Sequence, residues 1–436
     1  MSRNHKSTGI LSLLLVLVAV NLPAQGLQFS GYVRSYTGLL LNDASEFSIL
    51  QNTFNLKIED SRENVAFKIN PYIYHYTNED LIIGLREAYL DIYFDNMDLR
   101  LGKQQIIWGK ADGVFITDII SPKDLSEFLL RDFEEIRMGI TALKADYYIG
   151  NSTLELVWAP AFTPTQLAEE SSLWGRSPEF ESPIPGVTPT LSYDYSQKAV
   201  PATLENSEAF VKFSGVSSFI DYELMGGYIF DDDPSMSVAV DLTPDSNGVP
   251  QPQLTLTPQH NRLALVGGST SIDIMGYVVR SELAYYSGKN FQANENFQLG
   301  PASMTLPSGL AEKDYLHYLV GLDFSLGSTK LSTQFIQEYV LDYDEALVQE
   351  EVSNMSTFLI NRMFMNDLLT LQLFSYYDIS NEDALIQPSV NYDLADGFEI
   401  LAGANIFLAG INNDYLAYFG YYDDNDMLYL KLKYSF

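Results

Sequence analysis

Apolar and polar side chains alternate strictly over the last ten residues of the chain. One face of an extended strand there carries Leu428, Leu430, Leu432, Tyr434 and Phe436. The opposite face is mainly polar or charged. Successive side chains of a β-strand point to opposite faces, so this pattern predicts a strand with one apolar face over residues 427–436. Such a strand suits a wall with lipid on one side and water on the other.

Alternating runs of similar length recur along the whole sequence. They predict strands at residues 27–40, 54–59, 65–76, 84–94, 99–108, 138–149, 153–159, 208–215, 219–230, 262–270, 274–287, 315–326, 330–341, 354–365, 368–378, 384–394, 399–410 and 427–436. Short turns alternate with connections that are usually longer, as the two ends of a membrane barrel require. We therefore predict an all-β fold, a transmembrane antiparallel β-barrel of about 18 strands (roughly 16–20), with residues 411–426 as the last surface loop.

A soluble β-sandwich or β-propeller would also contain alternating strands. Neither fold needs a large apolar residue on the outer face of nearly every strand, and the sequence contains no repeat with the period of a propeller blade. After residue 25, no stretch is long and apolar enough for a membrane-spanning helix, which needs about 20 residues. The pattern therefore favours the barrel.

The first 25 residues have the three-part layout of a secretory signal peptide. A basic segment with Arg3, His5 and Lys6 precedes a nearly continuous apolar run over residues 9–20, and Ala24 offers a small residue for cleavage. The run is shorter than the about 20 residues that cross a bilayer, and an uncleaved anchor is the alternative. We predict that residues 1–24 are removed and that residues 25–436 form the barrel in the cell outer membrane.

Composition and charge agree with this prediction. The chain has 29 tyrosines and 25 phenylalanines, which suits aromatic girdles at the two membrane interfaces. It has no cysteine, so it has neither a disulfide scaffold nor a cysteine for lipid attachment. The net charge of −32 disfavours nucleic acid as a partner. Acidic clusters such as 231–233 and 423–426 are interpreted as solvated loop tips, and divalent cations that bridge lipid headgroups are the alternative.

Residues 109–137 form an insertion between two predicted strands. Ser121 and Pro122 offer an N-cap and a first helical residue. Apolar residues then recur at spacings of three and four: Leu125, Phe128, Leu129, Phe133 and Ile136. This spacing predicts an amphipathic helix in a loop on the extracellular side. The helix either folds into the barrel mouth as a constriction or caps the rim, and the sequence leaves both alternatives open.

Alternation assigns the side chains near the insertion to two faces. Leu90, Ile92, Leu101 and Ile107 fit the lipid face. Lys103 shares this face, where a lysine at mid-bilayer depth costs roughly 2–4 kcal/mol unless a bulge shifts the strand. The candidates for the lumen or the constriction are Glu87, Asp91, Arg100, Gln104, Trp108, Lys110, Asp112, Asp118, Lys123, Asp124, Arg131, Arg137, Lys144 and Asp146. Their charges are interpreted as a ladder that holds the wall and tethers the insertion, or as contacts to a solute.

The sequence contains no arrangement of residues that is typical of catalysis. Its four histidines, His5, His75, His260 and His317, show no metal-binding spacing, and there is neither a GxSxG motif nor a cysteine nucleophile. A lone histidine on a barrel strand is more typical of the lumen or the rim than of a catalytic base. We therefore expect a protein that is not an enzyme and that uses no cofactor and no metal.

Two tracts carry resemblances to known families. The tract "LREAYLD…DLRLGKQQIIWGKADGVFITDIISPKDL" is similar to a family of uncharacterised proteobacterial outer-membrane barrels, whose members often accompany RND-type exporters. Its "LRLGKQ…WG" hairpin is more distantly similar to alginate-export and phosphate-selective porin-like barrels. The alternating strand that ends on Phe436 resembles the C-terminal recognition signal of outer-membrane barrels. These resemblances imply a barrel that the barrel-assembly machinery recognises, with a periplasmic or inner-membrane RND-type transporter as a further partner.

These observations favour a porin-like channel for small solutes in contact with outer-membrane lipids, with a pore that residues 109–137 narrow. A conduit for lipids or hydrophobic compounds that cooperates with an RND-type transporter is the alternative. A structural or adhesive barrel without a pore is the second alternative. Conductance in planar bilayers separates these functions, because a conduit would carry bound lipid and conduct little.

Overall fold

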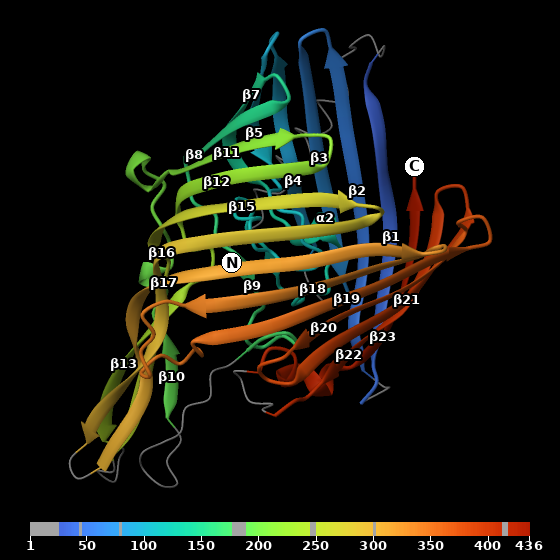
Figure 1. Ribbon diagram of the computed structural model, residues 1–436. Helices are drawn as coiled ribbons and strands as arrows, with labels where there is room; N and C mark the ends of the chain where they lie inside the picture. Colours follow the sequence, from blue (N-terminus) through green and yellow to red (C-terminus); the bar gives the residue numbers. More distant parts are fainter. Residues whose placement is uncertain are drawn as a thin grey trace, which may run out of the picture.

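The computed structural model describes residues 26–42, 46–77, 81–176, 189–244, 250–299, 302–411 and 417–436. Over these residues the chain forms an 18-stranded antiparallel barrel (Figure 1). β1 (Gln28–Leu40) pairs with β2 (Phe47–Arg62) on one side and with β23 (Met427–Ser435) on the other, so the sheet closes on itself. The predicted fold class is confirmed. The predicted signal peptide lies outside the described residues.

Fifteen further strands complete the wall: β3 (Val65–Tyr76), β4 (Ile82–Tyr93), β5 (Met97–Gln104), β7 (Ile140–Ile149), β8 (Ser152–Ala159), β11 (Glu208–Val216), β12 (Ile220–Phe230), β15 (Arg262–Ile274), β16 (Tyr277–Leu299), β17 (Ala302–Leu326), β18 (Thr329–Val340), β19 (Val352–Phe364), β20 (Leu369–Asp378), β21 (Asp383–Ala395) and β22 (Phe398–Leu408). We call the end of the barrel that carries the short turns and the C-terminal residue the turn side. The opposite end is the loop side.

The two faces of the wall differ as the alternation predicts. On β23 the outer face carries apolar side chains that are 37–49% exposed: Leu428, Leu430 and Leu432. Lys431 lies between them in sequence, points into the lumen and is 9% exposed. On β5, Leu101 is exposed on the outer face and Gln104 is fully buried inside. None of the helices in the described part of the chain is long and apolar enough to span a membrane.

A second, smaller sheet was missed by the sequence analysis. β10 (Thr190–Tyr193), β13 (Ser235–Pro244) and β14 (Pro250–Gln259) form it on the loop side, next to the outer halves of β16 and β17. Figure 1 shows this part projecting well beyond the barrel. Its apolar core consists of Val238, Leu254, Leu256 and Leu306. β13 and β14 contain four prolines, so the sequence favoured loops, whereas pairing between distant segments makes them strands.

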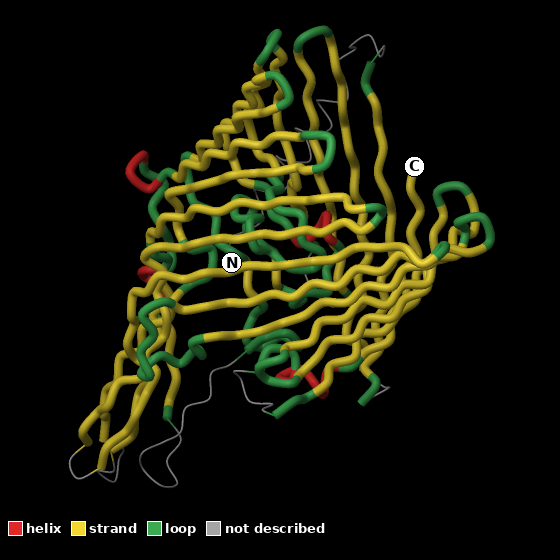
Figure 2. Tube along the Cα trace, viewed as in Figure 1, coloured by secondary structure: helices red, strands yellow, loops and turns green. Residues whose placement is uncertain are grey.

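Residues 105–139, which we call the insert, leave the wall after Gln104 and return to it at Ile140. Figure 2 shows loop segments, coloured green, inside the ring of strands. The remaining short elements in the described ranges are β6 (Asp124–Leu125), α2 (Phe133–Ile136), β9 (Gln166–Leu167) and the 3₁₀ helices η1 (Tyr195–Gln197), η2 (Leu204–Asn206) and η3 (Gly420–Asn425). β6 of the insert pairs with β9 of the next loop.

The prediction of an amphipathic helix from Ser121 to Ile136 is wrong, because in this segment only the single turn α2 is helical. The Ser121 hydroxyl does not cap a helix. It accepts a hydrogen bond from the backbone N–H of Ile106 and donates one to the carbonyl of the same residue, at 2.9 and 3.0 Å. Phe128 has a φ of 53°, which a right-handed helix does not allow. Tertiary contacts of the insert therefore outweigh its helical spacing.

Apolar side chains of the insert pack against the inner wall. Trp108, Ile116 and Ile120 are at most 3% exposed and form one cluster with inward-facing wall residues such as Phe210, Leu265 and Leu319. Burying each such side chain contributes about 1.5–3 kcal/mol. The insert therefore occupies space in the lumen rather than covering the rim.

Candidate functional site

Ion pairs hold one end of the insert to the wall; we call this group the ionic anchor. Asp132 lies 2.6 Å from both Arg34 of β1 and Lys431 of β23. Glu135 lies 2.9 Å from Arg34, and both of these side chains are 4% exposed. Burial alone would raise the pKa of Glu135, but the charges of Arg34 and Arg86 and the hydrogen bond from the Tyr32 hydroxyl together outweigh burial and lower that pKa. Removing one partner of a buried pair costs about 3–5 kcal/mol, because the other charge stays buried.

Hydrogen bonds and one ion pair hold the opposite end of the insert; we call this group the polar anchor. Glu282 of β16 is 3% exposed and accepts a hydrogen bond from the Thr117 hydroxyl at 2.7 Å. Arg280, also of β16, pairs with Asp112 at 2.5 Å. Gln334 of β18 donates to the Asp112 carbonyl at 2.7 Å. Two opposite parts of the wall therefore fix the insert across the lumen.

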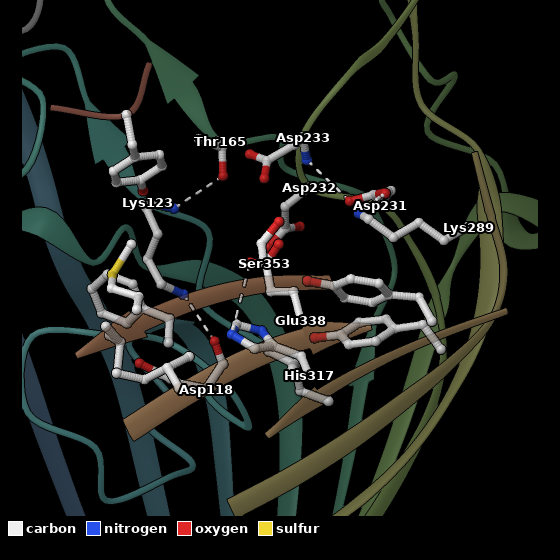
Figure 3. A pocket seen from close by; sticks show the side chains of 18 of the residues that line it. Asp118, Lys123, Thr165, Asp231, Asp232, Asp233, Lys289, His317, Glu338 and Ser353 are labelled. Atoms are coloured by element: carbon white, nitrogen blue, oxygen red, sulfur yellow. Dashed lines mark hydrogen bonds and ion pairs between the residues drawn. The ribbon is translucent and has the colours of Figure 1, made fainter. Parts of the chain in front are cut away.

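A cavity of about 560 Å³, which we call the outer cavity, lies on the loop side of the insert (Figure 3). Its lining contains six carboxylates and two lysines: Asp118, Asp231, Asp232, Asp233, Glu338, Asp378, Lys123 and Lys289. Six negative and two positive charges leave a formal charge of −4 when the lining residue His317 is neutral. The cavity therefore attracts positive charge and repels anions.

Both lysines of the outer cavity have partners, whereas several of its carboxylates, Asp232 and Asp233 among them, form no ion pair with a lysine or arginine in the described ranges. Lys289 lies 2.6 Å from Asp231, and the Lys123 ammonium donates to the Asp118 carbonyl at 2.9 Å. Over the described ranges, no basic side chain lies within salt-bridge distance of Asp232 or Asp233. Both side chains reach the water of the cavity. Because the barrel wall surrounds this water, the carboxylates are still largely shielded from bulk solvent, and this burial raises the pKa of each carboxyl.

A second cavity of about 360 Å³ lies between the insert and the inner faces of β19 to β23; we call it the inner cavity. Its lining contains two acidic and two basic residues: Asp112, Asp132, Arg131 and Lys431. These charges balance, and each of the four side chains is paired within the insert or with the wall. The charge of the lumen is therefore concentrated in the outer cavity.

The two cavities meet at three residues that line both of them: Gly113, Leu129 and Tyr376. We call this place the junction. The Tyr376 hydroxyl, on β20 (Leu369–Asp378), donates a hydrogen bond to the Gly113 carbonyl at 2.8 Å. Gly113 has a φ of +78°, and a Cβ there would lie 2.5 Å from the ring of Phe374. The insert therefore approaches this part of the wall as closely as a residue without a side chain allows.

The structure places the predicted lumen candidates in three groups inside the barrel. Glu87, Asp91, Arg100, Lys144 and Asp146 lie along the inner wall. Gln104 and Trp108 lie where the chain turns into the lumen. Lys110, Asp112, Asp118, Lys123, Asp124, Arg131 and Arg137 belong to the insert. Only Asp118, Lys123, Asp112 and Arg131 of this set line a cavity.

Several interpretations of charged residues need correction. Arg100 and Lys144 do not tether the insert, because their ion pairs, with Asp91 at 2.7 Å and with Asp146 at 2.8 Å, run along the wall. Residues 231–233 do not form a solvated loop tip, since they line the outer cavity. In the described ranges no group of three or more acidic or histidine residues is placed to hold a metal ion.

Lys103 remains on the outer face of β5, next to Leu101, and no bulge shifts this part of the strand. β5 pairs in continuous register with both neighbours, and Lys103 lies opposite Ala88 and Thr141. The irregularity lies instead between β3 and β4, where the register shifts at Asn70 and Pro71. The lysine is half-buried, one residue before the end of the strand.

The wall residues that hold the insert were not among the predicted lumen candidates. They are Arg34, Arg280, Glu282, Gln334, Tyr376 and Lys431. All of them lie on the inner face of their strands. Charged residues at inward positions of an alternating strand were a usable signal for Arg34, Arg280, Glu282 and Lys431. The pattern carries no information about which part of the insert they contact.

Solved structures with the same fold are outer-membrane proteins. The Pseudomonas aeruginosa protein OccK2 (OpdF), in complex with glucuronate, has a TM-score of 0.52 and 9% identity, with 94% of this chain and 97% of that chain covered. OccK8 (OprE) of the same organism has a TM-score of 0.52 and 10% identity, with 94% and 98% covered. Acinetobacter baumannii OccAB2 has a TM-score of 0.51 and 8% identity, with the same coverage.

The fold is therefore that of porin-like outer-membrane β-barrels. At identities of 8–10%, the similarity shows the fold alone. No curated protein matches the sequence. Residues 44–436 match the model of a family described as protein of unknown function (DUF1302). The chain belongs to this family.

Proposed function

We propose that the protein is a porin-like channel in which small solutes move between the outer cavity and the inner cavity through the junction. The observation that carries this proposal is that Gly113, Leu129 and Tyr376 line both cavities. The anchors fix the insert at β16 and β18 on one side and at β1 and β23 on the other, and the inner cavity lies between these two attachments, so the route follows the inner faces of β19 to β23. The insert then acts as the constriction, as in large barrels whose channel is narrowed by an inserted segment.

The charges of the lumen set the preference of this channel. The outer cavity has a formal charge of −4, whereas the acidic and basic residues of the inner cavity balance. A cleft that is lined by one sign of charge raises the local concentration of the opposite sign. Cationic and neutral solutes are therefore expected to pass more readily than anions of the same size.

A conduit for lipids or hydrophobic compounds is the second candidate, because the outer cavity also has a large apolar and aromatic surface. Its lining includes Ile229, Leu263, Ile336, Tyr286 and Tyr315. Such a conduit would hand its cargo to a periplasmic or inner-membrane transporter of the RND type. It would purify with bound lipid and conduct little current, so the experiment below separates it from a channel.

Replacing Tyr376 with alanine is expected to raise the single-channel conductance about twofold, because the ring that narrows the junction is lost together with its bond to the insert. The measurement is single-channel recording of the refolded protein in planar bilayers. Tyr377→Ala is the matched control, since Tyr377 is the next residue, lies on the outer face and is 43% exposed.

Tyr376→Phe separates the two effects, because it removes the hydroxyl bond and keeps the ring. A conductance close to that of the unmodified protein assigns the narrowing to the ring. If Tyr376→Ala and Tyr377→Ala conduct equally, the junction does not limit the flow. A folded protein that conducts no current with any of these side chains contradicts the channel and favours the conduit or a barrel without a pore.

A further inference from the structure

Lys289 shows how the outer cavity accommodates an ammonium group. Its nitrogen lies 2.6 Å from Asp231, and 6.0 and 5.9 Å from the ring centroids of Tyr286 and Tyr315. Carboxylates and aromatic faces are the groups that stabilise a cation that has lost part of its water. The protein's own lysine therefore demonstrates that the chemistry of this cavity suits an ammonium group.

Two further carboxylates in the same loop as Asp231 form no direct ion pair in the described part of the chain. Asp232 and Asp233 follow Asp231 in the same loop and have no basic side chain at salt-bridge distance in the described part of the chain. Figure 3 shows Asp231, Asp232 and Asp233 close together in one loop, with His317 and Glu338 of the wall below them in the view. Carboxylates held in an enclosed space without counterions favour a positively charged occupant.

The remainder of the outer cavity is apolar and large enough for a small molecule. Ile119, Ile229, Leu263, Ile336 and Met355 line it. Its volume of about 560 Å³ falls within the range of about 300–1,000 Å³ of small-molecule sites. An inorganic cation would leave this apolar surface without a contact, whereas an organic body would cover it.

We propose that the outer cavity is a binding site for an organic cation, a molecule with an ammonium or guanidinium group on an apolar or aromatic body. The positive group lies between Asp232, Asp233 and Glu338, and the body lies against Ile229, Leu263 and Ile336. This proposal rests on the proposed channel, because it names the class of solute that the channel takes up. The junction lies next to the site, so a bound molecule is positioned at the entrance to the inner cavity.

Binding of the cation is expected to weaken as the pH falls from 8 to 5. Burial raises the pKa of Asp232 and of Asp233, so these carboxyls take up protons at a higher pH than a free aspartic acid does. The other acidic and basic groups that line the site are Asp118, Asp231, Asp378, Glu338, His317, Lys123 and Lys289, and Glu208 and His260 act on the two aspartates from outside the lining. A proton gained by any of these acids or by either histidine acts in the same direction.

The test is isothermal titration calorimetry of the full-length barrel in detergent with three probes of similar shape. They are 2-phenylethylammonium as the cation, 3-phenylpropionate as the anion and 2-phenylethanol as the neutral molecule. The double substitution Asp232→Asn and Asp233→Asn should weaken binding of the cation tenfold or more and leave binding of the alcohol within twofold. Glu350→Gln with Glu351→Gln removes the same charge from two residues outside the cavity lining and should change neither.

The cation is expected to bind at least tenfold more tightly than the anion, and the preference should shrink at pH 5. Equal binding of cation and anion overturns the proposal, and so does a cation affinity that the Asp232 and Asp233 substitutions leave unchanged. Calorimetry requires no transport, so it is independent of the channel. Cation binding without conductance in planar bilayers removes the proposed function and keeps the site, whereas conductance without cation preference removes the site and keeps the channel.

Discussion

A barrel that lacks residues 113–134 is expected to conduct at least about threefold more current than the full-length protein, because an 18-stranded wall encloses a wide lumen when nothing fills it. The deletion removes Gly113 and Leu129 of the junction and the buried residues Ile116 and Ile120. A short glycine-serine linker between Asp112 and Glu135 keeps one contact of each anchor. Single-channel recordings measure the effect, and susceptibility of cells to large antibiotics reports it in the membrane.

Folding of the deletion variant has to be shown separately, because the loss of the insert uncovers Phe210, Leu265 and Leu319 on the inner wall. Heat-modifiable migration in electrophoresis shows that the barrel has formed. Arg100→Gln is a control that should leave the conductance unchanged, because Arg100 pairs with Asp91 on the wall and not with the insert. A folded deletion variant that conducts no more than the full-length protein contradicts a constriction by the insert.

The wall of the barrel could be predicted because each of its strands meets the same requirement independently. A strand between lipid and lumen must alternate, so period-two patterning appears in every run without knowledge of its neighbours. β3 matches the predicted residues 65–76, and β20 differs from its prediction by one residue. The outer halves of β16 and β17 do not contact lipid and carry no such constraint, which is why the prediction ended them 12 and 13 residues short.

The insert could not be predicted, because contacts between residues far apart in the sequence determine its conformation. Arg34 and Asp132 are separated by 98 positions, and Gly113 and Tyr376 by 263. The helical spacing from Leu125 to Ile136 is a local signal, and these contacts outweigh it. The outer cavity could not be predicted for the same reason. Three consecutive aspartates are typical of an exposed loop, and only the closure of the barrel places residues 231–233 in an enclosed cavity.

The aromatic loop before the last strand illustrates the same limit. Phe419 is fully buried and Tyr422 is 3% exposed, and both rings lie close to Phe128 of the insert. Tyr415, which the sequence groups with them, lies outside the described residues. The sequence predicted only a surface loop over residues 411–426, and it did not indicate that this loop packs on the insert.

Replacing Phe436 with aspartate is expected to lower the amount of assembled barrel in the outer membrane about tenfold and to leave periplasmic aggregate, since the last strand of such barrels presents an apolar face. The Phe436 ring is 48% exposed on the outer face and stacks on Phe54, with 6.4 Å between the centroids. Its backbone also closes the barrel, because it exchanges two hydrogen bonds of 3.0 Å with Gly31. The aspartate keeps these bonds, removes the ring and places a charge on the outer face.

Ser435→Asp is the matched control, because it introduces the same charge one residue earlier, on the face that points into the lumen. If the barrel-assembly machinery reads the apolar face of Leu428, Leu430, Leu432, Tyr434 and Phe436, Ser435→Asp should assemble close to normally and Phe436→Tyr should restore assembly. Deletion of Phe436 removes the closing hydrogen bonds as well, so it should be at least as damaging as the aspartate. Normal amounts of protease-resistant, heat-modifiable barrel with Phe436→Asp would show that the closing backbone bonds, and not the aromatic ring, are what assembly requires.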